Sequence, residues 1–137
     1  MMLVLVACDN TSSTEQFTIN ASKDTVSVGD VVTVQVVFKE IDGVKSYAIR
    51  PVLDEASFEL VNARNLQFGE ISDSTDGIIT TLFEEAKLMK NVTVAEYTFR
   101  AKTTGTQKAI GFSISLKGAD DVAIEATQPP SIYINVK

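Results

Sequence analysis

Apolar and polar residues alternate with a period of two along most of this chain of 137 residues. In the segment 31–39 every second position is apolar: Val32, Val34, Val36 and Phe38. Successive side chains of a β-strand point to opposite faces of the sheet, so this pattern predicts a strand that packs on one side only. The same alternation recurs in four later segments: 45–53, 93–101, 109–116 and 131–136. The pattern restricts the chain to a fold built almost entirely of strands.

Turn signals separate these segments at short intervals. Gly29-Asp30 precedes the strand at 31–39, and Asp42-Gly43 predicts a hairpin into the next strand. Pro51 has no N–H to donate, so we expect a bulge or a locally unpaired edge there. Short strands at this spacing predict an all-β fold, a two-sheet antiparallel β-sandwich of about nine strands, with a closed barrel as the alternative.

One segment departs from the strand pattern. Residues 84–90 consist only of good helix formers, and Glu84 and Lys87 are three positions apart, as in a stabilising pair on one helix face. We therefore expect one short helix of one or two turns near residues 84–91.

The only cysteine, Cys8, directly follows Leu5-Val6-Ala7, a run typical of the lipobox of a bacterial lipoprotein precursor. On this interpretation Cys8 is the lipid attachment site, and acyl chains contributing about 0.8 kcal/mol per buried methylene hold the domain at a membrane. Residues 1–8 are then a truncated signal remnant with the true start upstream, because they lack a basic residue and a full apolar stretch. The alternative is a fragment of an apolar strand.

The remaining chain divides into a tether and one domain. Residues 9–16 are polar and predict a flexible linker, and residues 17–137 are long enough for a single hydrophobic core. No apolar run approaches the roughly 20 residues of a membrane helix, so membrane contact is expected only through the lipid anchor. We expect an extracytoplasmic protein that is lipid-anchored at the bacterial cell surface or secreted.

Composition excludes several classes of function. A net charge of −6, with 12 basic against 18 acidic residues, argues against nucleic acid, which needs clustered Lys and Arg. The absence of histidine, with Cys8 the only thiol, excludes Ser-His-Asp and Cys-His catalysis and the common zinc sites. A carboxylate pair or a lysine nucleophile remains, but the chain has no Trp and three Tyr to line a cleft. We expect no enzymatic activity and no cofactor.

Two groups of aspartates, Asp73 with Asp76 and Asp120 with Asp121, have the oxygen chemistry that calcium prefers. Neither group follows the spacing of an EF-hand loop, and Asp beside Gly and Ser is the usual composition of turns. We expect turns and no metal site.

Three segments resemble the corresponding parts of a known family. The Val-rich strand after Gly29-Asp30 is similar to an opening strand of that family, and residues 95–101 before Gly105-Thr106 are similar to its late strand and Gly-Thr turn. Residues 53–61 occupy the place of a strand ending in Tyr-Asp-Pro, of which only Asp54 matches. The family is the cohesin domain, the receptor module of cellulosome scaffoldins. The resemblance extends over residues 17–137 and implies a jelly-roll sandwich of the carbohydrate-binding-module type.

The resemblance also implies a function. Cohesins hold dockerin modules, which carry the calcium, on a flat sheet face made by the third, fifth, sixth and eighth strands. The implied partner-binding residues are Ser46, Ala48, Arg50 and Val52 on the third strand, and Ala109, Gly111, Ser113 and Ser115 on the eighth. Small side chains let a partner helix lie against the sheet, and arginine is enriched at binding hot spots. An ordinary solvated face is the other interpretation.

Two further classes of function remain open. A carbohydrate-binding module uses exposed aromatic platforms, and the alternation places five aromatic residues in the core: Phe38, Tyr47, Tyr97, Phe99 and Phe112. Tyr133, Phe68 and Phe83 remain as platforms for a polysaccharide, which is the alternative partner. The third class is a structural sandwich domain of a surface layer or appendage.

Overall fold

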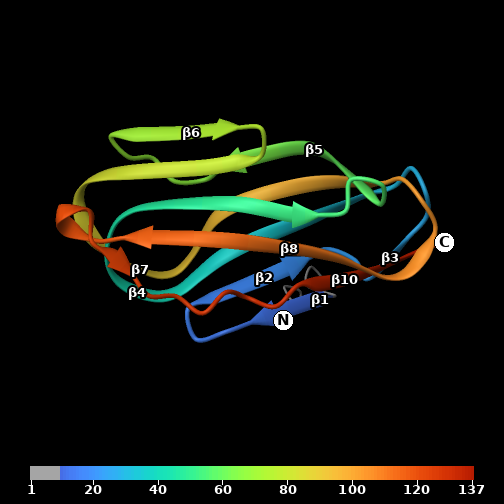
Figure 1. Ribbon diagram of the computed structural model, residues 1–137, viewed down its shortest axis with the longest axis horizontal. Coiled ribbons are helices and arrows are strands. Elements are labelled where there is room, and N and C mark those ends of the chain that lie inside the picture. Colours follow the sequence, from blue (N-terminus) through green and yellow to red (C-terminus); the bar gives the residue numbers. More distant parts are fainter. Residues whose placement is uncertain (1–9) are drawn as a thin grey trace, which may run out of the picture.

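The computed structural model describes residues 10–137 (Figure 1). Within this range the chain forms ten strands and a 3₁₀ turn at Ala119–Asp121, and it contains no α-helix. The strands are β1 (Asn10–Ser13), β2 (Phe17–Ala21), β3 (Thr25–Val26), β4 (Val31–Leu53), β5 (Phe58–Asn65), β6 (Ile71–Thr75), β7 (Ile78–Ala101), β8 (Gly105–Lys117), β9 (Ala123–Ile124) and β10 (Ile132–Val136).

The two long strands, β4 and β7, bend at the same end of the molecule and run through both of its layers (Figure 1). They pair with each other from Val31↔Arg100 to Ile49↔Ile79, with register shifts on both sides of Val44. Gly43, at the bend of β4, has a φ of 74°, which glycine adopts without strain. Asp42-Gly43 thus turns one continuous strand from sheet to sheet. The predicted hairpin is wrong, because the two halves of β4 pair with β7 and not with each other.

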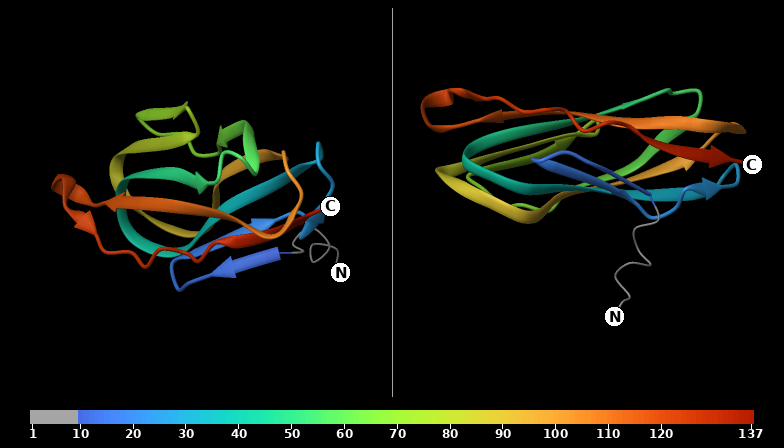
Figure 2. Two further views of the ribbon diagram at one scale, coloured as in Figure 1. Left: turned by 45° about the vertical axis from the view of Figure 1, so that its right-hand side comes forward. Right: turned by 90° about the horizontal axis from the view of Figure 1, so that it is seen from below.

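The halves of these strands belong to two sheets that face each other (Figure 2). The front sheet consists, in order, of β6, residues 78–82 of β7, residues 46–53 of β4, and β8. The back sheet consists of β1, β2, residues 31–41 of β4, residues 89–101 of β7, and β5. β10 pairs with the start of β8 and, in parallel, with β3. The predicted all-β sandwich with jelly-roll topology is confirmed, with ten strands where about nine were predicted.

The helix predicted near residues 84–91 is wrong, because this segment is the bend of β7. Lys87 pairs with Val44 and Met89 with Ile41 of β4, and Met89 is almost completely buried. Pairing with β4 and burial of the Met89 side chain outweigh helix propensity, which amounts to only a few tenths of a kcal/mol per residue.

The polar segment before Phe17 is also more ordered than predicted. Residues 10–13 form β1, which pairs with β2. The Thr14 hydroxyl accepts the Phe17 N–H at 3.1 Å and so fixes the turn between the two strands. Residues 10–13, which were expected to belong to a flexible linker, are therefore part of the back sheet. Cys8 and the rest of the expected signal remnant lie outside the described residues.

The side chains predicted to point inward fill the space between the sheets. Nearly all are buried: Val32, Val34, Val36, Phe38, Tyr47, Ile49, Ala95, Tyr97, Phe99, Ala101, Ile110, Phe112, Ile114, Leu116, Ile132, Ile134 and Val136. Val94 is buried as well as its neighbour Ala95, because the register of β7 against β4 shifts at this place. Pairing of β4 with β7 ends at Ile49 while pairing with β8 continues, which confirms a locally unpaired edge at Pro51.

Two buried tyrosines anchor separate aromatic clusters in this core. Tyr97 packs against Phe99 and Phe112, and its hydroxyl donates to the Gly77 carbonyl at 2.9 Å. Tyr47 packs against Phe38 and Phe83, and its buried hydroxyl makes no hydrogen bond of good geometry within residues 10–137. Burial raises the pKa of Tyr47 to about 12, although the nearby Thr81 side chain offsets part of the rise, and burial raises the pKa of Tyr97 as well.

Candidate partner-binding face

The outward side of the front sheet, called the front face below, is built from rows of aligned residues on four strands. One row joins Lys117 of β8, Ser46 of β4, Leu82 of β7 and Ile71 of β6. The next row joins Ser115, Ala48, Thr80 and Asp73 in the same strand order. In a third row Ser113 lies beside Arg50. The ladder therefore brings side chains from distant parts of the sequence onto one surface.

The chemistry of the front face changes from its centre to its edges. The centre carries small side chains, of which Ser113 and Ser115 are exposed and Ser46 and Ala48 half-buried. Two β-branched apolar side chains flank this centre: Ile71 and Val52 are each 56% exposed. A shallow groove of about 310 Å³ lies between Ile71 and Ser115. The centre is thus a low platform with apolar margins.

Polar groups on the front face are mostly left without internal partners. Arg50 is exposed and makes no hydrogen bond or ion pair to residues 10–137, and the same holds for the hydroxyls of Ser113 and Ser115. Two exceptions lie at its edges: Lys117 forms an ion pair with Asp121 at 3.3 Å, and the Thr75 hydroxyl donates to the Asp73 carboxylate at 3.0 Å. Donors and acceptors that face solvent in this way can bond a partner without first breaking an internal contact.

Six of the eight residues predicted from the sequence lie together on the front face: Ser46, Ala48, Arg50, Val52, Ser113 and Ser115. Ala109 is exposed but is aligned with Tyr133 of β10, beyond the rows described above. Gly111 is aligned with Val52 but is buried. A Cβ atom at Gly111 would lie 2.8 Å from the hydroxyl oxygen of Ser131. The chain leading into β10 covers this position, so Gly111 is not an accessible contact residue.

The resemblance implied two further strands on this face, but the sequence analysis named no residue of them; the structure shows that they are β6 and residues 78–82 of β7. Residues 73–77 were expected to be a turn, but β6 continues to Thr75 and only Asp76-Gly77, both with positive φ, forms the hairpin turn. On β7, Thr80 and Leu82 are half-buried on the front face. β6 is exposed along its whole length, so its sequence shows no alternation of apolar and polar residues that could have identified the fourth strand.

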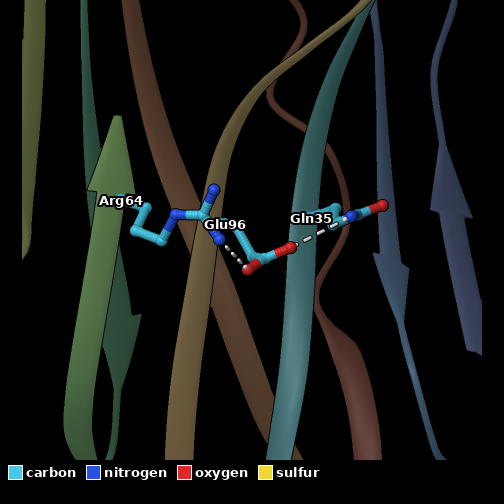
Figure 3. A network of polar contacts seen from close by, with 3 residues as sticks. All are labelled: Gln35, Arg64 and Glu96. Atoms are coloured by element: carbon cyan, nitrogen blue, oxygen red, sulfur yellow. Dashed lines mark hydrogen bonds and ion pairs between the residues drawn. The ribbon is translucent and has the colours of Figure 1, made fainter. Parts of the chain in front are cut away.

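The outward side of the back sheet, called the back face, has the opposite character. Glu96 at its centre accepts a hydrogen bond from the Gln35 amide at 3.2 Å and pairs with Arg64 at 3.1 Å (Figure 3). Arg100 pairs with Glu59 at 3.1 Å. These contacts join neighbouring strands, so the long polar side chains of the back face bond one another.

The described residues contain no group of three or more His, Cys, Asp or Glu that could hold a metal ion. Asp76, Asp120 and Asp121 have positive φ values and form turns, as the composition predicted. Asp54 is also a turn residue: it accepts the Ala56 N–H and the Ser57 hydroxyl, each at 3.0 Å, and these bonds lower the pKa of its carboxyl group. No helix in residues 10–137 has the length and apolar character needed to cross a membrane.

The expected aromatic platforms differ in accessibility. Phe83 is buried and cannot serve as one, because its ring packs against Tyr47 and lies beneath the Lys87 ammonium. Phe68 is 88% exposed on the loop between β5 and β6, and Tyr133 is 48% exposed on β10.

Fold and site together define a jelly-roll β-sandwich domain with one open sheet face of small residues. The family model of the Cohesin domain matches residues 16–132, so the chain belongs to the cohesin family. No curated protein gives a sequence match.

Solved cohesin structures share the fold at low identity. A cohesin module from a family 33 glycoside hydrolase of Clostridium perfringens ATCC13124 aligns with a TM-score of 0.71 and 13% identity, over 93% of this chain and 99% of that one. A non-cellulosomal cohesin from the archaeon Archaeoglobus fulgidus aligns with a TM-score of 0.61 and 16% identity, over 89% of this chain and 91% of that one. The sixth cohesin of Acetivibrio cellulolyticus scaffoldin B was solved in complex with a Cel5 dockerin mutant. It aligns with a TM-score of 0.62 and 14% identity, over 89% of this chain and 99% of that one.

Proposed function

We propose that this chain is a non-catalytic, extracytoplasmic recognition module that binds a dockerin-type partner through its front face. The observation that carries the proposal is the contrast between unpaired polar groups on the front face and the bonded network on the back face. Membership of the cohesin family and the cohesin–dockerin complexes among the similar structures support this choice of partner. The contact residues proposed are Ser46, Ala48, Arg50, Val52, Ser113 and Ser115, with Ile71, Thr80 and Leu82 added from β6 and β7.

The shape of the front face suits a helical partner. Four strands spaced about 4.8 Å apart make a platform roughly 15 Å wide, which exceeds the 10–12 Å diameter of an α-helix. The small side chains of Ala48 and Ser115 let a helix approach the sheet closely. The exposed apolar side chains of Ile71 and Val52 then lose water on contact, at about 25 cal/mol per Å².

We also propose that Cys8 carries a lipid that places the domain at the outer side of a membrane. The lipobox-like sequence before Cys8 supports this proposal. Residues 10–13 already belong to β1, and Asn10 is two positions from Cys8 in the sequence, so the domain would lie close to the bilayer rather than at the end of a spacer. Expression in bacteria of a precursor with an upstream start provides the test. Replacement of Cys8 by serine should release the protein from the membrane fraction, and unchanged fractionation would contradict the anchor.

Binding is tested with the full chain and purified dockerin modules from the same genome. Arg50→Glu should weaken binding at least about tenfold, because a large exposed donor at the centre of the interface is replaced by the opposite charge. Arg64→Glu, the same substitution on the back face, is the matched control and should leave the affinity within about twofold, since this arginine lies outside the proposed interface. The proposal is wrong if no dockerin binds, or if Arg50→Glu and the control bind equally well.

A further inference from the structure

A second cleft lies away from the front face, where the ends of the chain meet. It has a volume of about 320 Å³ and is formed by β1, the start of β8, β10 and the segment between β2 and β3. The residues that matter here are Asn10, Asp24, Gln107, Tyr133 and Asn135. In Figure 1, β1 and β10 lie side by side in this region. Residues 105–110 of β8, which pair with β10, lie beyond the rows that form the front face.

The frame of this cleft is fixed by hydrogen bonds between its elements. The Asn10 amide donates to the Tyr133 carbonyl at 2.7 Å and thereby links β1 to β10. The Asn135 side-chain oxygen accepts the Gln107 N–H at 2.9 Å, and the Asn135 N–H donates to the Asp24 carbonyl at 2.8 Å. Four separate pieces of chain are therefore held in one arrangement before any ligand arrives, which reduces the ordering that binding requires.

Several polar groups of the cleft stay free after this frame is made. The side-chain amide of Gln107, the carboxylate of Asp24 and the amide nitrogen of Asn135 form no hydrogen bond to residues 10–137. They offer both donors and acceptors. Tyr133 adds an aromatic surface that is 48% exposed. Such a combination, one aromatic surface beside planar amide and carboxylate groups, matches a ligand with apolar C–H faces and many hydroxyls.

The lining of the cleft excludes other classes of ligand. No Lys or Arg lines it, which disfavours phosphate and other anions, and its single carboxylate is too few for a metal ion. Its mostly polar lining disfavours a lipid. A volume near the lower end of the range of roughly 300–1,000 Å³ for small-molecule sites fits one or two sugar rings rather than a helix.

We propose that this cleft binds a neutral saccharide, with a pyranose ring against Tyr133 and its hydroxyls bonded by Gln107, Asp24 and Asn135. This is a second binding activity, independent of partner binding at the front face. It gives the domain contact with a polysaccharide at a position that leaves the front face free.

The test uses the full chain and a panel of neutral oligosaccharides: cello-, xylo-, manno- and chito-hexaose. Titration calorimetry and NMR chemical-shift mapping should detect at least one of them, with shifts at Asn10, Gln107 and Asn135. Tyr133→Ala should weaken that binding at least about tenfold, because stacking on the ring is lost. Gln107→Ala should weaken it less, because one of several hydrogen bonds is removed.

Phe68→Ala is the matched control, since it removes an exposed aromatic ring from a distant loop and should leave saccharide binding unchanged. The melting temperature of each variant shows that the fold is intact. The proposal is wrong if the unmodified chain binds none of the oligosaccharides in the panel. It is also wrong if Tyr133→Ala and Phe68→Ala bind the saccharide with equal affinity. Dockerin binding, measured on the same variants, should not change, so this proposal and the proposed function can fail separately.

Discussion

The front and back sheets of the sandwich differ in what their polar groups bond. On the back face Glu96 joins Gln35 to Arg64, and Arg100 pairs with Glu59 (Figure 3). On the front face Arg50 and the serines of β8 have no such partner within the described part of the chain. The same contrast holds inside the core, where Tyr97 on the back sheet has a hydrogen-bond acceptor and Tyr47 on the front sheet has none.

This difference shows how two similar sheets acquire different roles. Exposed ion pairs contribute only about 0–1 kcal/mol each, so the network on the back face does little for stability. Its effect is that a protein approaching the back face must break internal bonds to form its own. A protein approaching the front face meets groups that water alone satisfies. The front face is therefore the better docking surface.

The largest expected effect concerns the edge of the back sheet. Deletion of residues 1–16 removes β1, its ladder with β2, and the side-chain bonds to the Tyr133 and Pro130 carbonyls. At roughly 1 kcal/mol per hydrogen bond we expect a loss of about 2–4 kcal/mol in the free energy of unfolding. Urea denaturation of this variant and of a control lacking only residues 1–9 measures the difference. Equal midpoints for the two variants would show that β1 does not stabilise the back sheet.

A bulky substitution on each face tests the comparison directly. Ser115→Trp places a large ring on the low centre of the front face and should weaken dockerin binding about 100-fold, which corresponds to about 2.7 kcal/mol. Thr98→Trp, at a half-buried position on the back face, should leave affinity within about twofold. Surface plasmon resonance with both variants provides the measurement. If Thr98→Trp is the more damaging substitution, the back face is the docking surface.

Removal of the Tyr97 hydroxyl tests the buried tyrosine that has a hydrogen-bond acceptor. In Tyr97→Phe the Gly77 carbonyl loses its buried donor, and we expect a destabilisation of about 1–2 kcal/mol with the ring packing unchanged. For a domain of this size each kcal/mol corresponds to roughly 3–5 °C in melting temperature. Calorimetry of the variant should therefore show a lower melting temperature. An unchanged value would mean that this hydrogen bond makes no net contribution.

The alternation of residues predicted the fold and the outward side chains of β4 and β8, because side chains that alternate in or out of a core obey a local rule. That these side chains form a binding face was implied by the resemblance to cohesins. Ser46, Ala48 and Arg50 could be placed on the face by counting from Tyr47 and Ile49. Gly111 could not, because the chain that covers it comes from Ser131, which no local rule relates to it. The bend at 84–90 was misassigned for a similar reason: its pairing partner is in β4, more than forty residues earlier.

The smallest expected effect has the opposite sign and concerns Tyr47. Its hydroxyl is buried without a hydrogen bond to the described residues, and an unsatisfied buried donor is unfavourable. Tyr47→Phe keeps the contacts with Phe38 and Phe83, so it should stabilise the fold by up to about 1 kcal/mol, where Tyr97→Phe destabilises it. Opposite shifts of the two melting temperatures confirm the contrast, whereas a destabilised Tyr47→Phe would show that the hydroxyl bonds a partner such as the nearby Thr81 side chain.

The pH dependence of stability sharpens this last test. The pKa of Tyr47 rises from 10.0 to about 12 in the folded protein, because burial disfavours the phenolate. The unfolded chain therefore loses this proton first. The contribution that this pKa difference makes to the free energy of unfolding is complete below pH 10 and is lost as the pH rises toward 12. Tyr47→Phe lacks this titration, so its advantage over the unmodified chain should widen between these pH values in urea denaturation. A constant difference would mean that the Tyr47 hydroxyl titrates as freely in the folded state as in the unfolded state.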